Sequence, residues 1–330
     1  MLSSGENNVM TMILAVVFWV LAAGVLFTTL APITGSTQWW VRGWDFPRVH
    51  IAIASLLAIA LGVWLSHAGT YFMSVALLAC ALYQLTWIYP YTPLASREIE
   101  VANGKDPADA VSILSVNVLM ENDDHARLQA LIEREDPDVL LLMEVNDRWQ
   151  AALEPQLERF DTVVRHPLEN HYGMIFATRL PTRDAKTIFL SDDETPTAFA
   201  ELKAPGGWFY FIGRHPQPPV PGTDTEERDT QIRKSATIAD RTVLPVVAMG
   251  DFNDVAWSRT SQKFKSYGGF RDPRVGRGIL ASFDAKSWIM RFPIDQLYLT
   301  EGLDLLAFSR LEDIGSDHFP MKAEVAVTRQ

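Results

Sequence analysis

An Asp and an Asn stand two residues apart directly after a short apolar run, in the sequence VVAMGDFNDVAWS at residues 246–258. The run Val-Val-Ala-Met is typical of a strand buried on both faces, and Gly250 allows the backbone to bend where the strand ends. From the turn that follows, the Asp251 carboxylate can take a proton from water while the Asn253 carboxamide holds a phosphate oxygen. The pattern predicts the floor of a hydrolytic site, and an ordinary Asx turn is the alternative.

Two more apolar runs contain a polar residue near the end of a predicted strand. SVNV at 115–118 contains Asn117, and LLLMEV at 140–145 contains Glu144. A buried carboxamide needs a hydrogen-bond partner, and a carboxylate at the end of a buried strand needs a cation. One or two carboxylates with waters suit Mg²⁺, so we predict a hard divalent ion at Glu144. An ion pair with a nearby Arg is the alternative.

Two strand-terminal segments supply histidines. FIGRHPQPP at 211–219 contains Arg214 and His215, both able to hold an anionic oxygen, although a structural loop is the alternative. GSDHFPM at 315–321 places Asp317 beside His318, and a helix cap or turn is the alternative there. A carboxylate next to an imidazole orients it or raises its pKa, which keeps it protonated near neutral pH.

IDQLYL at 294–299 places Asp295 in another apolar strand, where the buried carboxylate needs a partner. His318 is the candidate for that partner.

Taken together, these residue types and their order resemble the endonuclease/exonuclease/phosphatase superfamily over about residues 111–327. The GDFN and SDH blocks are the most specific elements of the resemblance. The segment YGMIFATRLP at 172–181 is also similar to a family segment, with Thr178 in place of the usual Ser, and Gln296 stands where many members have His or Tyr. The resemblance implies an α/β fold in which a two-sheet sandwich, like that of DNase I, has helices on its outer faces.

The resemblance also implies a divalent metal, Mg²⁺ or Mn²⁺, bound by Glu144 with Asn117 and Asp317 close to it. Asn117 would in addition contact a substrate phosphate, as would Arg214.

Catalysis in this scheme comes from positioning and charge stabilisation around an in-line displacement. Asp251 would activate the attacking water, while Asn253 and His215 would hold phosphate oxygens. His318, oriented by Asp295, would stabilise the pentacovalent transition state.

The first ninety residues form a different kind of segment. They hold only four charged side chains and contain three uncharged apolar stretches, at about 10–31, 49–66 and 70–89, which we predict to be transmembrane helices. A cleaved signal peptide is the alternative for the first, although no basic residue precedes it. We therefore predict a membrane anchor over 1–90, a linker over 91–109 and a catalytic domain over 110–330.

Within the catalytic domain, apolar runs alternate with helical or loop segments, as in an α/β fold. Strands are predicted at 111–118, 139–143, 173–178, 208–213, 245–249, 294–299 and 321–327. Helices are predicted at 123–135, 147–157 and near 225–240. The loop at 216–231 is expected to border the substrate entrance, and a solvated connection is equally compatible with its composition.

Almost all charged residues lie beyond residue 90, so the soluble part carries the net charge of −11. Such a surface repels a phosphate backbone, which makes nucleic acid an unfavourable partner. The expected partners are a lipid bilayer and a phosphoester, lipid-linked or small, and the sequence indicates no protein partner. A tethered nuclease and an inactive membrane scaffold are the alternatives.

The anchored architecture is similar to a membrane-anchored bacterial subgroup of the superfamily, which implies a multi-pass protein of the bacterial inner membrane. Relatives in that subgroup are thought to hold the catalytic domain outside the cytoplasm. Arg42 and Arg48 between the first two helices favour the opposite orientation, because basic connections tend to be cytoplasmic. The sequence leaves the membrane face undecided.

Overall fold

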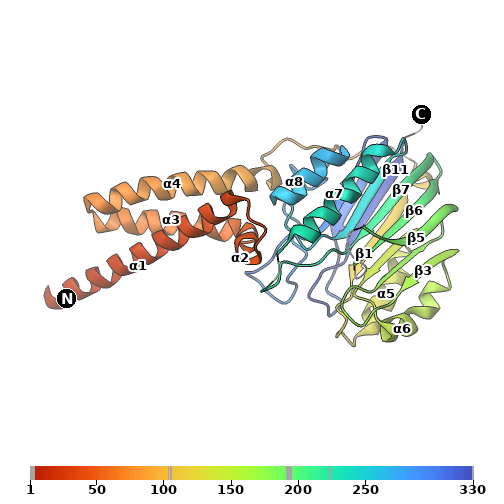
Figure 1. Cartoon of the computed structure of the whole chain (residues 1–330), viewed down its shortest axis with the longest axis horizontal. Coiled ribbons are helices and arrows are strands. Elements are labelled where there is room, and N and C mark those ends of the chain that lie inside the picture. The colour runs from red at the N-terminus through yellow and green to blue at the C-terminus, as the bar shows by residue number, and fades with distance from the viewer. Residues whose placement is uncertain (1–3, 103, 105, 191–194, 223, 329–330) are drawn as a thin grey trace. The chain divides into compact units, whose positions relative to one another are not determined.

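The computed structural model describes residues 4–102, 104, 106–190, 195–222 and 224–328 (Figure 1). It contains two compact units. The first comprises Met1–Pro90 together with Pro219–Asp224, and the second comprises Tyr91–Pro218 and Thr225–Gln330. We call them the helical unit and the catalytic unit and describe each by itself.

The helical unit contains three helices long and apolar enough to cross a membrane. The candidate spans are Asn8–Thr34, Arg48–Leu65 and Ala68–Tyr91, close to the stretches predicted from the sequence. They correspond to α1 (Ser4–Leu30), α3 (Arg48–Leu65) and α4 (Ala68–Ile88), and the short α2 (Trp39–Arg42) lies between the first two.

A buried polar cluster joins these helices. Arg48 pairs with Asp45 and donates to Gln84 Oε1 at 3.0 Å, and the Gln84 amide donates to Thr29 at 3.0 Å. Arg42 lies 3.5 Å from the other oxygen of Asp45. Both arginines thus have a structural role inside this unit, which explains their presence without reference to topology.

The catalytic unit is built from two mixed β-sheets packed face to face. The first sheet has the order β10-β11-β1-β2-β4-β3 and the second has the order β5-β6-β7-β8-β9. The strands of the first are β1 (Val111–Asn117), β2 (Val139–Met143), β3 (Thr162–His166), β4 (Met174–Thr178), β10 (Leu303–Arg310) and β11 (Met321–Val327). Those of the second are β5 (Thr182–Phe189), β6 (Pro196–Ala204), β7 (Gly207–Arg214), β8 (Val246–Asp251) and β9 (Asp295–Leu299).

Helices cover the outer face of each sheet (Figure 1). Residues of α5 (His125–Glu135) and α6 (Asp147–Leu157) form an apolar cluster with the first sheet, in which Trp149 is fully buried. Residues of α7 (Glu226–Arg241) and α8 (Arg259–Gly268) form another with the second sheet. A third cluster lies between the sheets and includes Leu141 and Phe211. The predicted two-sheet sandwich with outer helices is confirmed.

Sequence reasoning missed four strands, β3, β5, β6 and β10, and helix α8. Strands β3, β5 and β10 are sheet edges, and their side chains are mostly only half-buried. A strand with little buried surface carries charged residues and lacks the apolar run by which the central strands were found.

The stretch 91–102 packs on the catalytic unit instead of hanging free. Tyr91 donates to the Ala256 carbonyl at 2.8 Å, and Glu98 accepts from the Asp272 backbone at 2.8 Å. Val101 forms a β-bridge with Leu305. Much of the expected linker therefore belongs to the folded unit.

Two parallel crossovers bring strand ends together. β1 and β2 are parallel with α5 between them in the chain, and β7 and β8 are parallel with α7 between them. The carboxyl ends of each pair consequently lie at one edge of their sheet, where loops in α/β proteins usually carry functional groups.

Gly250, the penultimate residue of β8, occupies a position where the backbone conformation and the lack of space both favour glycine. Its φ is 139°, and a Cβ atom built there would lie 2.2 Å from the Arg214 carbonyl oxygen. We expect Gly250→Ala to destabilise the protein by about 2–4 kcal/mol, because strain and overpacking act together. Gly269→Ala is the control, since Gly269 has a φ of 63° but no atom within 4 Å of its virtual Cβ. Thermal unfolding midpoints should fall clearly more for Gly250→Ala, and equal shifts would contradict the steric argument.

Candidate active site

Asp251 is the centre of the cluster at the ends of these strands. Its Oδ2 lies 3.6 Å from Nε2 of His215 and 3.6 Å from Nε2 of His318. Asn117 Nδ2 donates to the same oxygen at 3.3 Å. Oδ1 accepts a hydrogen bond of 2.7 Å from the Asn253 backbone. One buried carboxylate thus meets side chains from both sheets.

His318 is held by a second buried carboxylate. Its Nδ1 lies 2.8 Å from Asp295 Oδ2, as the sequence suggested. Burial by itself would lower the pKa of His318, but the charges of Asp295 and Asp251 outweigh burial and raise the pKa to about 10. The imidazole is therefore protonated at neutral pH and presents a cationic Nε2–H to the site.

His215 has the opposite character. Burial, assisted by the positive charge of His318, lowers its pKa to about 3. It is therefore a neutral imidazole at physiological pH, and its Nδ1 has no hydrogen-bond partner among the described residues. The site consequently contains one cationic and one neutral histidine at equal distances from one carboxylate oxygen.

The protonation of Asp251 follows from this arrangement. Burial raises its pKa to about 7, and the charge of His318 limits the rise. A carboxylate with a pKa near neutrality is suited to accept a proton from water, because general bases work best when their pKa lies close to the operating pH.

Glu144 lies on the other side of Asn117. Its Oε1 accepts from Asn117 Nδ2 at 2.8 Å, and its Oε2 accepts from the Met120 backbone at 3.3 Å. Its φ of 63° is unusual for a residue with a side chain, and such strained conformations cluster at functional sites. Burial raises the pKa of this carboxyl. Within the described residues no Lys or Arg pairs with it, and the neutral His215 at 3.9 Å supplies no charge.

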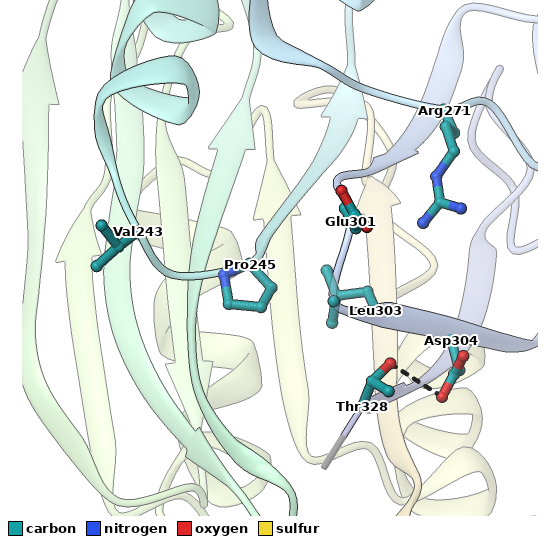
Figure 2. Close-up of a pocket in the computed structure, with 8 residues that line it drawn as sticks. Val243, Pro245, Arg271, Glu301, Leu303, Asp304 and Thr328 are labelled. Atoms are coloured by element: carbon teal, nitrogen blue, oxygen red, sulfur yellow. Dashed lines mark hydrogen bonds between the residues drawn. The ribbon is translucent and has the colours of Figure 1, made fainter. Parts of the chain in front are cut away.

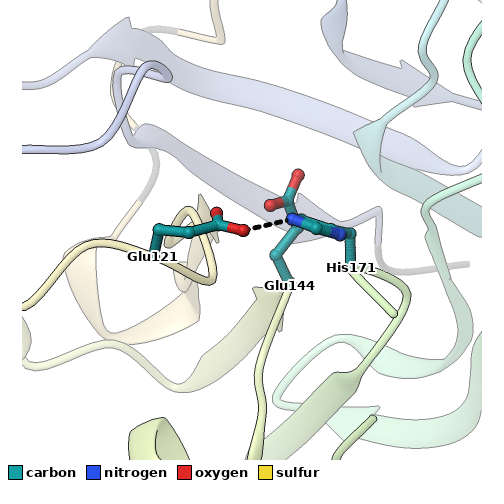
Figure 3. Close-up of side chains that lie close together, drawn as sticks. All are labelled: Glu121, Glu144 and His171. Carbon is teal, nitrogen blue, oxygen red and sulfur yellow. Dashed lines mark hydrogen bonds and ion pairs between the residues drawn. The ribbon is translucent and has the colours of Figure 1, made fainter. Parts of the chain in front are cut away.

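Two side chains that the sequence analysis missed extend the Glu144 site. His171 and Glu121 point toward Glu144 from neighbouring loops, with His171 Nε2 2.6 Å from Glu121 Oε1 (Figure 3). One ligand atom of each of the three residues lies within 4.8 Å of the others. Carboxylate oxygens with one imidazole fit a divalent ion such as Mg²⁺ or Mn²⁺. That no described Lys or Arg pairs with Glu144 supports the same fit.

The remaining predicted residues differ in their placement. The charge of Asp317 raises the pKa of both Glu144 and His318, which indicates that Asp317 lies near the site. It belongs to neither of the two groups of clustered ligand atoms found among the described residues, Glu121–Glu144–His171 and Asp251–Asp295–His318. Asn253 has a φ of 47°, and its amide donates to the Pro216 carbonyl at 2.8 Å.

Arg214 does not face the cluster. Its fully buried guanidinium donates to the Gln231 carbonyl at 3.2 Å and to Ser235 of α7, and it lies over the Phe252 ring. Successive side chains of a strand point to opposite faces, so His215 enters the site while Arg214 turns outward. The expectation that Arg214 holds a phosphate oxygen is corrected accordingly, and the residue supports α7 instead.

Several positioning residues carried no sequence signal. Ser316 donates to the Asn117 carbonyl at 2.9 Å and accepts from the His318 backbone at 3.0 Å. Ser282 accepts from the Asp295 backbone at 3.1 Å. A serine in a loop is common, so only the folded chain reveals that these two hold catalytic strands in place. Of the residues that sequence reasoning missed, His171 alone has a sequence signal, because it directly precedes the family-like segment at 172–181.

A surface pocket of about 580 Å³ lies at the other end of the same strands (Figure 2). Pro245 precedes β8 and Glu301 follows β9, whereas Asp251 ends β8 and Asp295 begins β9. Its polar lining includes Arg271, Glu301 and Asp304 but no histidine. The pocket is separate from the cluster around Asp251.

Comparison with known proteins agrees with this site. The profile of the Endonuclease/Exonuclease/phosphatase family matches residues 114–318, which is more than half of the chain. The chain belongs to the endonuclease/exonuclease/phosphatase family. Members of this family are hydrolases that act on phosphodiester bonds, and they typically use divalent metals. No curated protein sequence matches the chain.

Solved structures of the family share the fold at low identity. D. rerio TDP2 complexed with a single-strand DNA product is 16% identical with a TM-score of 0.56, and the match covers 66% of this chain and 99% of that one. A family protein from Bacteroides thetaiotaomicron is 17% identical with a TM-score of 0.52. That match covers 66% of this chain and 95% of the other. The family protein from Beutenbergia cavernae DSM 12333 is 17% identical with a TM-score of 0.51, and the match covers 67% of this chain and 72% of that one.

The raised pKa of His318 depends on Asp295. In metal-free protein we expect Asp295→Asn to lower that pKa by more than about one unit, since an opposite charge at this distance shifts a pKa by 1–3 units. Histidine-selective ¹⁵N NMR at several pH values measures this directly, with His318→Gln assigning the resonance. An imidazolium that persists to pH 9 in Asp295→Asn would refute the assignment.

Metal binding should depend on Glu144. We expect Glu144→Gln to weaken Mn²⁺ binding by more than about tenfold, because ligand-shell changes cost at least that much. Glu301→Gln, at the distant pocket, should leave it unchanged. Calorimetric titration measures the Mn²⁺ affinity of both variants. The same titration of His171→Ala shows whether His171 takes part in binding the metal together with Glu144. Equal affinities for wild type and Glu144→Gln would place the metal elsewhere.

Proposed function

We propose that this protein is a membrane-tethered, divalent-metal-dependent phosphoesterase that hydrolyses a lipid-linked or small phosphoester or pyrophosphate. The observation that carries the proposal is the pair of histidines around Asp251, one cationic and one neutral, each 3.6 Å from the same oxygen. A base between two groups that can donate to phosphate oxygens is what in-line attack by water requires.

In this reaction Asp251 takes a proton from water as the water oxygen attacks phosphorus. The bond from phosphorus to the ester oxygen breaks on the opposite side, and the leaving oxygen is protonated from solvent. The cationic Nε2–H of His318 stabilises the negative charge that gathers on the phosphoryl oxygens, and Asp295, hydrogen-bonded to Nδ1, keeps the ring protonated. His215 donates a second hydrogen bond as a neutral imidazole.

Asn117 supports both halves of the site, because its amide contacts Glu144 and Asp251. Asn253 would hold a phosphate oxygen only by giving up its hydrogen bond to Pro216. Glu144, with Asn117 and Asp317, would hold Mg²⁺ or Mn²⁺, and Glu121 and His171 offer further ligands. When bound, the metal polarises a phosphoryl oxygen and offsets the excess of carboxylates.

Charge and anchoring support this substrate class. A net charge of −11 opposes a nucleic-acid backbone, whereas a single phosphoryl group requires only local cations. Three helices able to span a bilayer support association with a membrane, proposed here to be the inner membrane of a bacterial cell. A reporter fused after Gln330 would give the face on which the catalytic unit lies.

The test is phosphate release by the full-length protein with Mg²⁺ from a panel of lipid and soluble phosphoesters and pyrophosphates. We expect Asp251→Asn to lower the rate by about 10²–10⁴-fold, because the amide cannot accept the proton. Asp304→Asn is the matched control, since Asp304 lines the distant pocket, where it accepts a hydrogen bond from Thr328 at 3.1 Å (Figure 2). It should retain the wild-type rate.

The same preparation separates the alternatives. Cleavage of plasmid DNA that is lost in Asp251→Asn, without release from the phosphoester panel, would favour a tethered nuclease. No hydrolysis of any substrate, with the same behaviour in Asp251→Asn, would favour an inactive scaffold.

A further inference from the structure

The segment from Phe283 to Phe292, here called the 283–292 loop, forms a short hairpin beside the active site. Phe283 donates from its backbone to Phe292 at 3.1 Å, and Asp284 donates to Met290 at 3.1 Å. Ser287 N contacts the Asp284 carbonyl at 3.2 Å and closes the turn. Internal hydrogen bonds thus define the shape of this loop.

The base of the loop is part of the wall of the site. The Phe283 ring packs on the His318 ring with centroids 4.8 Å apart, and the two residues form a β-bridge. Ala285 donates from its backbone to the Asp317 carbonyl at 2.7 Å. The base of the loop therefore contacts the cationic His318 directly through Phe283 and contacts its neighbour Asp317 through Ala285.

The tip of the loop is apolar and open to solvent. Three consecutive side chains are exposed, Trp288 by 91%, Ile289 by 72% and Met290 by 47%. Such a run is unfavourable in water and usually marks a surface that contacts an apolar partner. Tryptophan in particular favours the boundary between lipid chains and headgroups.

Three cations lie in this loop or beside it. Arg291 lies over the rings of Trp288 and Phe319, and Arg310 lies over the Phe319 ring at 4.4 Å. Lys286 stands in the loop itself, beside the single carboxylate of Asp284. Among the described residues, none of these three cations forms an ion pair with a carboxylate. These three cations, here called the basic ring, contrast with the net charge of −11 of the whole chain.

We propose that the 283–292 loop is a membrane-contact element, in which Trp288 and Ile289 enter the interfacial region of a bilayer while Lys286, Arg291 and Arg310 meet anionic headgroups. An anionic lipid surface matches both the apolar tip and the basic ring. A membrane is also within reach, because the catalytic unit begins at Tyr91, where the last candidate span ends. The contact places His318 beside the lipid surface.

This inference adds to the proposed function the means of reaching a lipid-linked phosphoester. The contact itself does not depend on catalysis, so the two can fail separately.

The single cysteine of the chain allows a direct test in the full-length protein. Cys80→Ala gives a cysteine-free background, into which Ile289→Cys is introduced and labelled with an environment-sensitive fluorophore. The protein is placed in nanodiscs of phosphatidylcholine with about 30% phosphatidylglycerol, with or without a spin-labelled lipid that quenches near the headgroups. Val243→Cys is the matched control, since Val243 is 96% exposed and precedes β8 at the opposite end from Asp251.

We expect the Ile289→Cys label to show blue-shifted emission and strong quenching by the spin-labelled lipid, and the Val243→Cys label to show neither. Lys286→Gln in the same background should weaken the lipid contact about fivefold, since one cation near an anionic surface contributes roughly 1 kcal/mol. If the two labels behave alike in nanodiscs, the loop does not contact lipid. A label that becomes protected only in native membranes would indicate a protein partner and would also overturn the proposal.

A second measurement links the contact to substrate access. Replacing Trp288 and Ile289 by Ser should lower hydrolysis of a bilayer-embedded phosphoester relative to that of a soluble one by about tenfold, because bilayer access loses apolar contact area. An unchanged ratio would contradict a role in access. If wild-type protein hydrolyses neither substrate, the proposed function has failed, while the quenching experiment still decides the lipid contact.

Discussion

The rest of the site depends on one electrostatic arrangement, in which the imidazolium of His318 lies between the buried carboxylates of Asp251 and Asp295. Either carboxylate alone, removed from water, would be strongly unfavourable. With the cation between them, Asp295 keeps its hydrogen bond to Nδ1 and Asp251 faces Nε2 across 3.6 Å. Burial nevertheless raises the pKa of Asp251, because it outweighs the charge of His318, and this gives Asp251 the capacity to take a proton.

Both sheets are needed to build this arrangement. Asp251 and Asp295 are register partners across β8 and β9 of the second sheet, while His318 enters from the loop before β11 of the first sheet. The sheets are also connected at the site itself, since Asp251 N donates to Met143 Sδ at 3.2 Å and Asn117 reaches Asp251. Because the core between the sheets is tightly packed, small shifts of one sheet would change distances at Asp251.

Unusual backbone conformations occur where this geometry is set. Glu144 and Asn253 both have positive φ values, and each directly follows or lies near the end of a central strand. Such conformations cost on the order of 1–3 kcal/mol and persist where surrounding packing imposes them. Here they place one carboxylate beside Glu121 and His171 and one backbone N–H on Asp251. The 283–292 loop joins the same region to an apolar, basic surface.

The sequence by itself determined the family, the central strands and the three apolar helices. Buried strands are continuous apolar runs, and a polar residue inside such a run is conspicuous, as with Asn117, Glu144 and Asp295. The pairing of Asp295 with His318 was also accessible, because each was a buried group in need of a partner. Edge strands such as β3 and β5 were not accessible, since a half-exposed strand resembles a loop in composition.

Only the tertiary structure decided which of two adjacent polar residues faces the site. Arg214 and His215 are equally plausible in sequence, but the alternation of a strand sends the first under α7 and the second to Asp251. It also brought Glu121 and His171 to Glu144 and placed Phe283 beside His318, across separations along the chain that no local pattern records. The physical reason is that local composition specifies whether a residue is buried, whereas its partners depend on the packing of distant elements.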